Sequence, residues 1–168
     1  EERLKPLDLD GALIAAAGDD GLQSRLLPGL ADGSTVGAVA LGGSVTVSDG
    51  TASGDAGVVL GGASASVLLV PVGDDVAVVA DVESGAGVAI ESPPSLDPSR
   101  PSVRVTLDGA PVTVVPGARR ALVDLARVIL SADAVGVARE CTEMGAAYSK
   151  ERIQFGRPIA MYQAVKHH

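Results

Sequence analysis

Aromatic residues and cysteine are scarce in this sequence. It contains no tryptophan, and aromatic residues make up 2% of its 168 positions, so the core must be built from small and β-branched side chains. Cys141 is the one cysteine, which excludes a disulfide within the chain and favours a reducing compartment. No apolar run is long enough to span a bilayer and no signal peptide is visible, so we expect a cytoplasmic protein.

Basic residues are scarce in the first two thirds of the chain. Residues 1–118 contain 5 Lys or Arg against 16 Asp or Glu, whereas residues 119–168 contain 8 against 5. An acidic body argues against nucleic-acid binding. The basic end is where we expect an anionic ligand or partner to bind. Hydrophobic residues make up 46% of the chain, which argues against a disordered protein.

Valine and glycine, by contrast, are abundant between residues 34 and 116. Turn residues such as Asp49-Gly50 and Asp108-Gly109 separate short valine-rich segments, and the second pair predicts a tight hairpin. We predict eight strands, at residues 36–41, 44–47, 56–60, 66–72, 76–82, 87–90, 102–107 and 112–115. This spacing is typical of an antiparallel sandwich or barrel. Residues 1–33 have a helical pattern, so the predicted fold class is α+β.

A run of good helix formers without proline extends from residue 118 to residue 150. Apolar positions recur in it every three or four residues and define one helix face. That face is apolar except for one aspartate and consists of Leu122, Ala126, Ile129, Asp133, Val137, Cys141, Met144 and Tyr148. A helix of more than about eight turns is long for a small domain, which indicates a helical bundle or a subunit interface.

Basic residues crowd the loop after this helix, in the segment KERIQFGRPI. Lys150, Arg152 and Arg157 supply cations, and guanidinium groups match phosphate oxygens in a bidentate geometry. Phe155 adds an apolar face and Gln154 an amide, so the loop suits the diphosphate and adenine of a nucleotide cofactor. The alternative is that the basic residues only complement the dipole at the helix C-terminus.

The segment KERIQFGRPIAMYQAVKHH resembles the helix-loop-helix that opens the C-terminal domain of acyl-CoA dehydrogenases. The preceding RVILSADAVGVARECTEMGAAYS is similar to the same family without a gap. The resemblance implies that the loop reaches across a dimer interface to the ADP half of an FAD that another subunit mainly holds. By position, the implied cofactor contacts are Arg152, Gln154, Phe155, Tyr162 and Gln163.

The segment LLPGLADGSTVGAVAL resembles the family's passage from an N-terminal helical domain into a middle β domain. The resemblance implies three parts: the end of a helical domain at 1–33, a β-barrel domain at 34–116, and the start of a C-terminal helical bundle at 117–168. Family members are more than twice this length, so we expect a fragment of a longer protein.

The sequence departs from the family where the flavin ring would bind. A Thr-Glu-Pro segment that touches flavin and substrate in the family is replaced here by Gly42-Gly43-Ser44-Val45. The family's Trp-Ile-Thr, which shields the flavin ring and bonds near its reactive nitrogen, is matched by Val58, Val59 and Leu60. These residues supply neither a hydrogen bond nor an aromatic face. We therefore expect the chain to lack residues that grip a flavin ring of its own.

The motif DLAR falls where the family's long helix lines the acyl-CoA pocket, which implies substrate contacts for Asp124 and Arg127. The alternative is an ion pair on a solvated helix face. Ala126 stands where some family members carry their catalytic glutamate. The more usual glutamate lies beyond His168, so no catalytic residue is assigned. His167 and His168 lack nearby partner ligands, and we expect no metal site.

The resemblance thus implies an oxidoreductase that dehydrogenates an acyl-CoA thioester with FAD. The lost flavin contacts are similar to those of the accessory subunit in bacterial heterotetrameric members that degrade sterol side chains. We therefore expect a partner subunit that supplies the flavin pocket and base, and a sterol acyl-CoA substrate. Two alternatives stay open: an ordinary homotetrameric acyl-CoA dehydrogenase, and a non-enzymatic β-sandwich module with a helical dimerisation arm.

Overall fold

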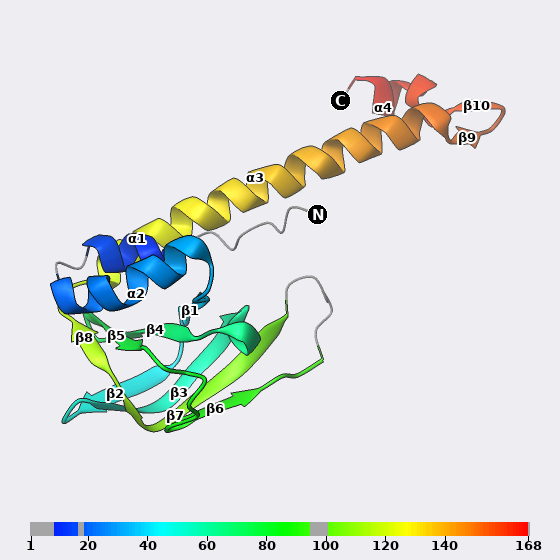
Figure 1. The fold of residues 1–168 in the computed structure, drawn as a ribbon. Helices are drawn as coiled ribbons and strands as arrows, with labels where there is room; N and C mark the ends of the chain where they lie inside the picture. The colour runs from blue at the N-terminus through cyan, green and yellow to red at the C-terminus, as the bar shows by residue number, and fades with distance from the viewer. Residues whose placement is uncertain (1–8, 17–18, 95–100, 168) are drawn as a thin grey trace. The chain divides into compact units, whose positions relative to one another are not determined.

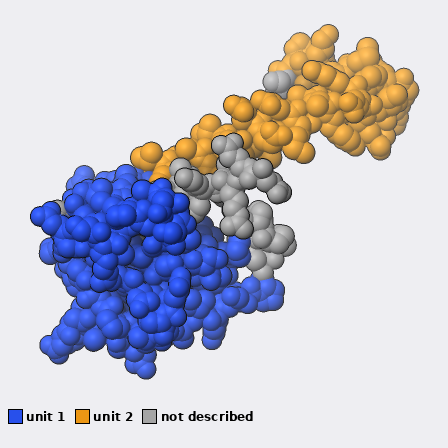
Figure 2. All heavy atoms as spheres, viewed as in Figure 1, with its two compact units in different colours: residues 1–126 blue, residues 127–168 orange. Residues whose placement is uncertain are grey.

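The computed structural model describes residues 9–16, 19–94 and 101–167. It divides into two compact units, residues 1–126 and residues 127–168 (Figure 2). Each unit has a different kind of architecture. The first consists of two short helices, two sheets and the beginning of the long helix, and the second consists of the rest of that helix and the segments that follow it (Figure 1).

Two helices open the described chain, α1 (Leu9–Ala16) and α2 (Asp20–Asp32). The Asp19 carboxylate accepts a hydrogen bond from the Leu22 amide at 2.8 Å and caps the start of α2. Gly33 ends the helix in the left-handed conformation, with φ +80°. The helical pattern predicted within residues 1–33 is therefore confirmed for the described part of that range.

The first sheet has the strand order β1-β4-β5-β8. Its strands are β1 (Gly37–Val39), β4 (Val67–Val72), β5 (Asp75–Val79) and β8 (Thr113–Val115). β1 pairs with β4 in parallel, and the other pairs are antiparallel. Residues 67–70 of β4 are all buried, because this sheet is covered on both faces.

The second sheet has the strand order β2-β3-β7-β6 and is antiparallel throughout. Its strands are β2 (Ser44–Ser48), β3 (Thr51–Leu60), β6 (Val88–Glu91) and β7 (Ser102–Pro111). In β7, Val103, Val105 and Leu107 are buried while the residues between them are exposed. This alternation shows that only one face of the second sheet is covered.

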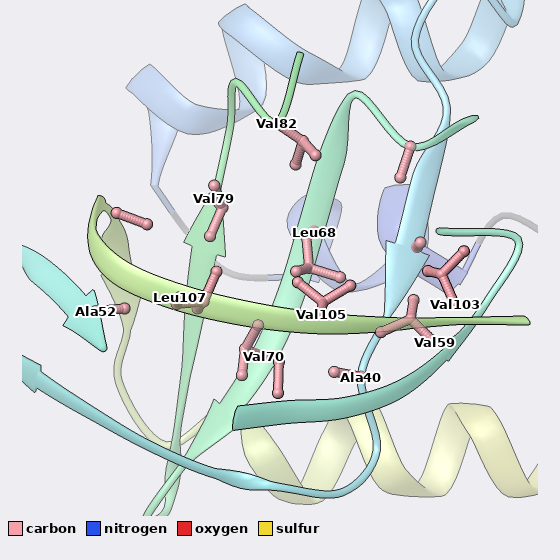
Figure 3. Packing of buried hydrophobic residues seen from close by; sticks show 14 residues of the cluster. Ala40, Ala52, Val59, Leu68, Val70, Val79, Val82, Val103, Val105 and Leu107 are labelled. Atoms are coloured by element: carbon pink, nitrogen blue, oxygen red, sulfur yellow. The ribbon is translucent and has the colours of Figure 1, made fainter. Parts of the chain in front are cut away.

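The two sheets pack face to face around a core of small side chains (Figure 3). The residues labelled there are Ala40, Ala52, Val59, Leu68, Val70, Val79, Val82, Val103, Val105 and Leu107. Each buried valine or leucine contributes about 1.5–3 kcal/mol relative to an exposed one. Of the two architectures predicted, the sandwich is confirmed, since the described strands form two separate sheets and no closed barrel.

A second cluster lies between the first sheet and the helices. Leu13 and Ile14 of α1 and Leu22 and Leu26 of α2 meet apolar residues of the first sheet there. Leu122 joins the same cluster from α3 (Arg119–Glu151). One face of β4 packs against the second sheet and the other face packs against the helices, so this unit has three layers.

All eight predicted strands are present, but the predicted hairpin turn at Asp108-Gly109 is wrong. These two residues lie inside β7, where the pairing partners shift from Leu107 opposite Gly54 to Ala110 opposite Ala52. Gly109 has φ +68°, and its amide donates a hydrogen bond to the Ser53 hydroxyl at 2.9 Å. The pair forms a β-bulge, because a glycine with positive φ serves a bulge as well as a turn.

The long predicted helix is confirmed as α3. On its predicted face, Leu122 and Ala126 are buried, whereas Val137, Met144 and Tyr148 are exposed. The face is therefore covered only near its beginning. No helix within residues 9–16, 19–94 and 101–167 combines the length and hydropathy that a membrane crossing requires.

Candidate functional site

A short hairpin follows α3 in the second unit (Figure 1). β9 (Ile153–Gln154) pairs antiparallel with β10 (Arg157–Pro158), and Phe155 and Gly156 form the two-residue turn between them. Their φ values of +50° and +79° are those of a type I′ turn. The sequence thus folds the basic loop into a defined hairpin.

Phe155 is the most exposed large apolar side chain among those described, at 94%. A bulky residue with positive φ is rare and costs on the order of 1–2 kcal/mol. The turn therefore holds an aromatic ring in solvent, in a conformation that glycine would adopt more readily. Such a combination is typical of a residue that contacts a ligand or partner.

Backbone and side-chain hydrogen bonds hold the hairpin at its base. The Arg152 amide donates to the Tyr148 carbonyl at 2.8 Å, and the Ile159 amide donates to the Arg152 carbonyl at 2.9 Å. The Tyr162 hydroxyl reaches back and donates to the Gln154 carbonyl at 3.0 Å. The predicted contacts Arg152, Gln154 and Phe155 are therefore brought onto one hairpin, with Tyr162 bonded to it.

Two further helical segments follow the hairpin, a 3₁₀ turn (Ile159–Met161) and α4 (Gln163–Lys166). Gln163, the fifth predicted cofactor contact, is the first residue of α4 and is exposed. Its side-chain amide can both donate and accept hydrogen bonds. Gln163 directly follows Tyr162, whose hydroxyl is hydrogen-bonded to the hairpin, so Gln163 lies close to the hairpin in the chain.

The charges of the hairpin have the sign that a diphosphate requires. Arg152 and Arg157 are exposed there, and Lys150 is exposed in the last turn of α3 just before it. The Gln154 amide nitrogen donates to the carbonyl of Ile153 at 2.9 Å, which fixes the orientation of that side chain. The two guanidinium groups and the amide can hydrogen-bond to the diphosphate of an ADP group. The exposed aromatic face can pack against its adenine. The residues present fit that half of the cofactor.

Arg157 on β10 is not among the cofactor contacts that the family resemblance implied. The guanidinium carbon of Arg157 lies over the ring of Tyr162, 4.1 Å from its centroid. The sequence offers one signal for this contact: Tyr162 follows Arg157 by five positions in a segment that was expected to turn. Periodicity did not reveal it, because the contact depends on the turn between them.

The predicted substrate residues lie on α3. Asp124 forms an i,i+4 ion pair with Arg120, with 3.6 Å between Oδ2 and Nε. Both side chains are largely exposed, so the pair contributes little to stability. Arg127 is exposed on the same helix, and Ala126 is buried. Substrate contact by Asp124 and Arg127 stays a prediction.

β3 contains the residues that we expect to match the family's flavin-shielding segment, and its outer surface there is apolar. Val58 and Leu60 on β3 are each 58% exposed, and Val59 between them is buried. Beside Val58 is a hollow of about 330 Å³ whose lining includes Arg104 and Glu91. Arg104 forms an ion pair with Asp55 at 3.5 Å. The donor set here does not match a flavin ring, because the exposed strand residues are aliphatic.

Gly42 and Gly43 stand where the family's Thr-Glu-Pro segment would be. Gly43 has φ +109°, and a Cβ on it would collide with the carbonyl oxygen of Asp55. The segment is thus shaped by close backbone packing against β3. Among residues 9–16, 19–94 and 101–167, no group of three or more His, Cys, Asp or Glu is placed to hold a metal ion. His168 lies outside the described residues.

Comparison with known proteins gives consistent similarities. A family model described as "Acyl-CoA dehydrogenase, C-terminal domain" matches residues 118–168. The chain is 41% identical over 145 residues to the acyl-CoA dehydrogenase FadE34 of Mycobacterium tuberculosis, covering 85% of this chain and 20% of the relative. The chain therefore spans about a fifth of that relative's length.

Solved structures share the whole described fold. A steroid ACAD, Tcur3481-Tcur3483, superposes with a TM-score of 0.84 at 32% identity, over 98% of this chain and 49% of the other. The ChsE4-ChsE5 complex from Mycobacterium tuberculosis gives a TM-score of 0.80 at 25% identity, over 95% of this chain and 48% of the other. The chain spans about half the length of these structures.

Proposed function

The chain belongs to the acyl-CoA dehydrogenase family, and from this premise we propose that it is part of an enzyme that dehydrogenates an acyl-CoA thioester between its α and β carbons. FAD is the cofactor that the family implies, and a structurally similar glutaryl-CoA dehydrogenase is solved in complex with FADH2. The observation that carries the proposal is the hydrogen-bonded hairpin, which offers exposed cations and the exposed ring of Phe155, a residue with positive φ, to an anionic dinucleotide.

The proposed role of the hairpin is to hold the ADP half of FAD. Arg152 would donate to the diphosphate, and Phe155 would offer its ring to the adenine. Gln154, Tyr162 and Gln163 would contribute polar contacts around them. Bound in this way, FAD would supply a two-electron acceptor for the hydride of the β carbon. The hairpin itself binds and orients, and it carries no group that takes the α proton.

The proposed assembly is one in which this chain pairs with a homologous catalytic subunit. Support comes from Val58 and Leu60, which are aliphatic where the family shields its flavin, and from Ala126, which offers no carboxylate. A partner would then supply the flavin-ring pocket and the catalytic base. Similarity to a steroid ACAD supports a sterol acyl-CoA as the substrate. Similarity to the ChsE4-ChsE5 complex supports an assembly of two different chains.

Several further parts of the proposal rest on position in the family. Residues 1–33, 34–116 and 117–168 would be the end of the N-terminal helical domain, the middle β domain and the start of the C-terminal bundle. Asp124 and Arg127 would contact the acyl-CoA. The exposed free thiol of Cys141 supports a reducing, cytoplasmic setting.

Replacing Arg152 tests this function. Arg152→Ala should weaken FAD binding by the purified enzyme roughly tenfold to a hundredfold, the loss expected for a charge-assisted hydrogen bond of about 1.5–3 kcal/mol. Equilibrium reconstitution of the apoprotein, followed by flavin fluorescence, measures the change. Arg139→Ala is the matched control, because Arg139 is an exposed arginine of α3 paired with Glu143. Equal FAD binding in both variants would remove Arg152 from the cofactor site.

A further inference from the structure

Arg157 occupies a defined position on the hairpin. It opens β10 and pairs in register with Gln154 of β9. The Tyr162 hydroxyl is bonded to that same Gln154 through its carbonyl oxygen, at 3.0 Å. Gln154, the cross-strand partner of Arg157, and Tyr162, whose ring contacts the Arg157 guanidinium, are thus hydrogen-bonded to each other.

The ring of Tyr162 fixes the guanidinium of Arg157. The distance of 4.1 Å from the guanidinium carbon to the ring centroid is that of a cation–π contact. Tyr162 is half-buried, whereas Arg157 is exposed. A ring below the guanidinium occupies one of its faces and leaves the in-plane N–H groups available for hydrogen bonding. The contact therefore orients the cation without using up its donors.

We propose that Arg157 is a second cation that binds the diphosphate of the dinucleotide, and that Tyr162 is a positioning residue that acts through Arg157. This inference rests on the function proposed above and changes the role of Tyr162 from a direct cofactor contact to a support. Arg152 and Arg157 then flank the turn, one directly before β9 and one at the start of β10. A pre-oriented guanidinium has fewer rotamers to lose when it binds phosphate.

Four variants of the FAD-containing holoenzyme test the proposal, with FAD affinity measured at several salt concentrations. Arg157→Gln should weaken FAD binding about tenfold and make it less sensitive to salt, because one ionic contact is lost. Arg157→Lys keeps the charge but not the planar fork, and should weaken binding about threefold. Tyr162→Leu removes the ring and should also weaken it about threefold. Tyr162→Phe keeps the ring and should stay within about twofold of the wild type.

The double variant Arg157→Gln/Tyr162→Leu separates support from direct contact. If Tyr162 acts through Arg157, the double variant binds FAD no more weakly than Arg157→Gln alone. Losses that multiply would show that Tyr162 touches the cofactor itself, and would overturn its positioning role. If Arg157→Gln did not fold, Arg157→Lys and the two Tyr162 variants would still decide the matter.

Comparison with Arg152→Ala distinguishes the two proposals. If Arg152→Ala weakens FAD binding and Arg157→Gln does not, the inference about Arg157 fails while the proposed function stands. If neither substitution changes FAD binding, both fail. Weaker binding in both variants, with a reduced salt dependence in each, is the expected result.

Discussion

Two adjacent glycines, in the segment that departs from the family's Thr-Glu-Pro, show how much the structural role of a residue depends on its position. At Gly43 the backbone has φ +109° and passes so close to β3 that a Cβ would meet Asp55 and Ala56. At Gly42 no atom lies within 4 Å of an added Cβ. The two positions therefore differ in both the conformation and the space that a side chain would need.

We expect Gly43→Ala to lower the free energy of unfolding by about 2–4 kcal/mol, because it combines an unfavourable φ with a backbone collision. Gly42→Ala, the control at the neighbouring position, should change it by less than about 1 kcal/mol. Urea denaturation followed by circular dichroism measures both values. Equal stability of the two variants would contradict the packing described for β2 and β3.

The chemistry of the candidate site could be anticipated from residue types, whereas its conformation could not. Arg152 and Phe155 were predicted from charge, aromatic character and resemblance. The left-handed backbone of Phe155 and the contact between Arg157 and Tyr162 were not. Both depend on the two-residue turn, and an aromatic residue before glycine carries little propensity for positive φ.

At the scale of elements, periodicity predicted most of the fold. The helix expected over residues 118–150 is observed at Arg119–Glu151, and valine-rich segments bounded by turns gave all eight strands of the two sheets. The exception at Asp108-Gly109 has a physical reason, since β7 continues through a bulge paired to β3. A glycine in the sequence shows where the backbone can readily adopt positive φ, but long-range pairing decides whether the chain turns there.

The exposed part of α3 gives a prediction for this element. Val137 and Met144 lie on the predicted apolar face and are 54% and 62% exposed. In the proposed assembly this face is buried against another subunit, where an unpaired carboxylate is costly. Val137→Glu and Met144→Glu should each weaken assembly by at least about tenfold without lowering the stability of the separate chain.

Val135→Glu is the matched control, because Val135 is 69% exposed on the opposite side of the same helix. Analytical ultracentrifugation over a range of concentrations measures the assembly of all three variants. If Val137→Glu and Met144→Glu assembled as well as the wild type, the predicted face would not be a subunit interface.

At the scale of the whole molecule, the residues expected near the ADP half of the cofactor suit their ligand better than those expected near the flavin ring. The hairpin carries the cations and aromatic ring that suit an ADP group, whereas the strand matched to the flavin-shielding segment exposes Val58 and Leu60. A chain that bound the entire cofactor alone would need a polar or aromatic contact to the flavin ring. Because this chain offers contacts for the ADP group but none of these for the flavin ring, we expect FAD binding to require a second, unlike subunit.

Production of the full-length protein with and without the product of a neighbouring related gene tests this expectation. The purified protein should lack the visible absorbance band of flavin when it is produced alone, and should show that band in the complex. Arg152→Ala in the complex should reduce the band, because the hairpin would still contribute to binding. A yellow protein in the absence of any partner would favour a homomeric dehydrogenase. A colourless complex that forms normally would instead favour a non-enzymatic sandwich module with a helical arm, since assembly would then occur without the cofactor.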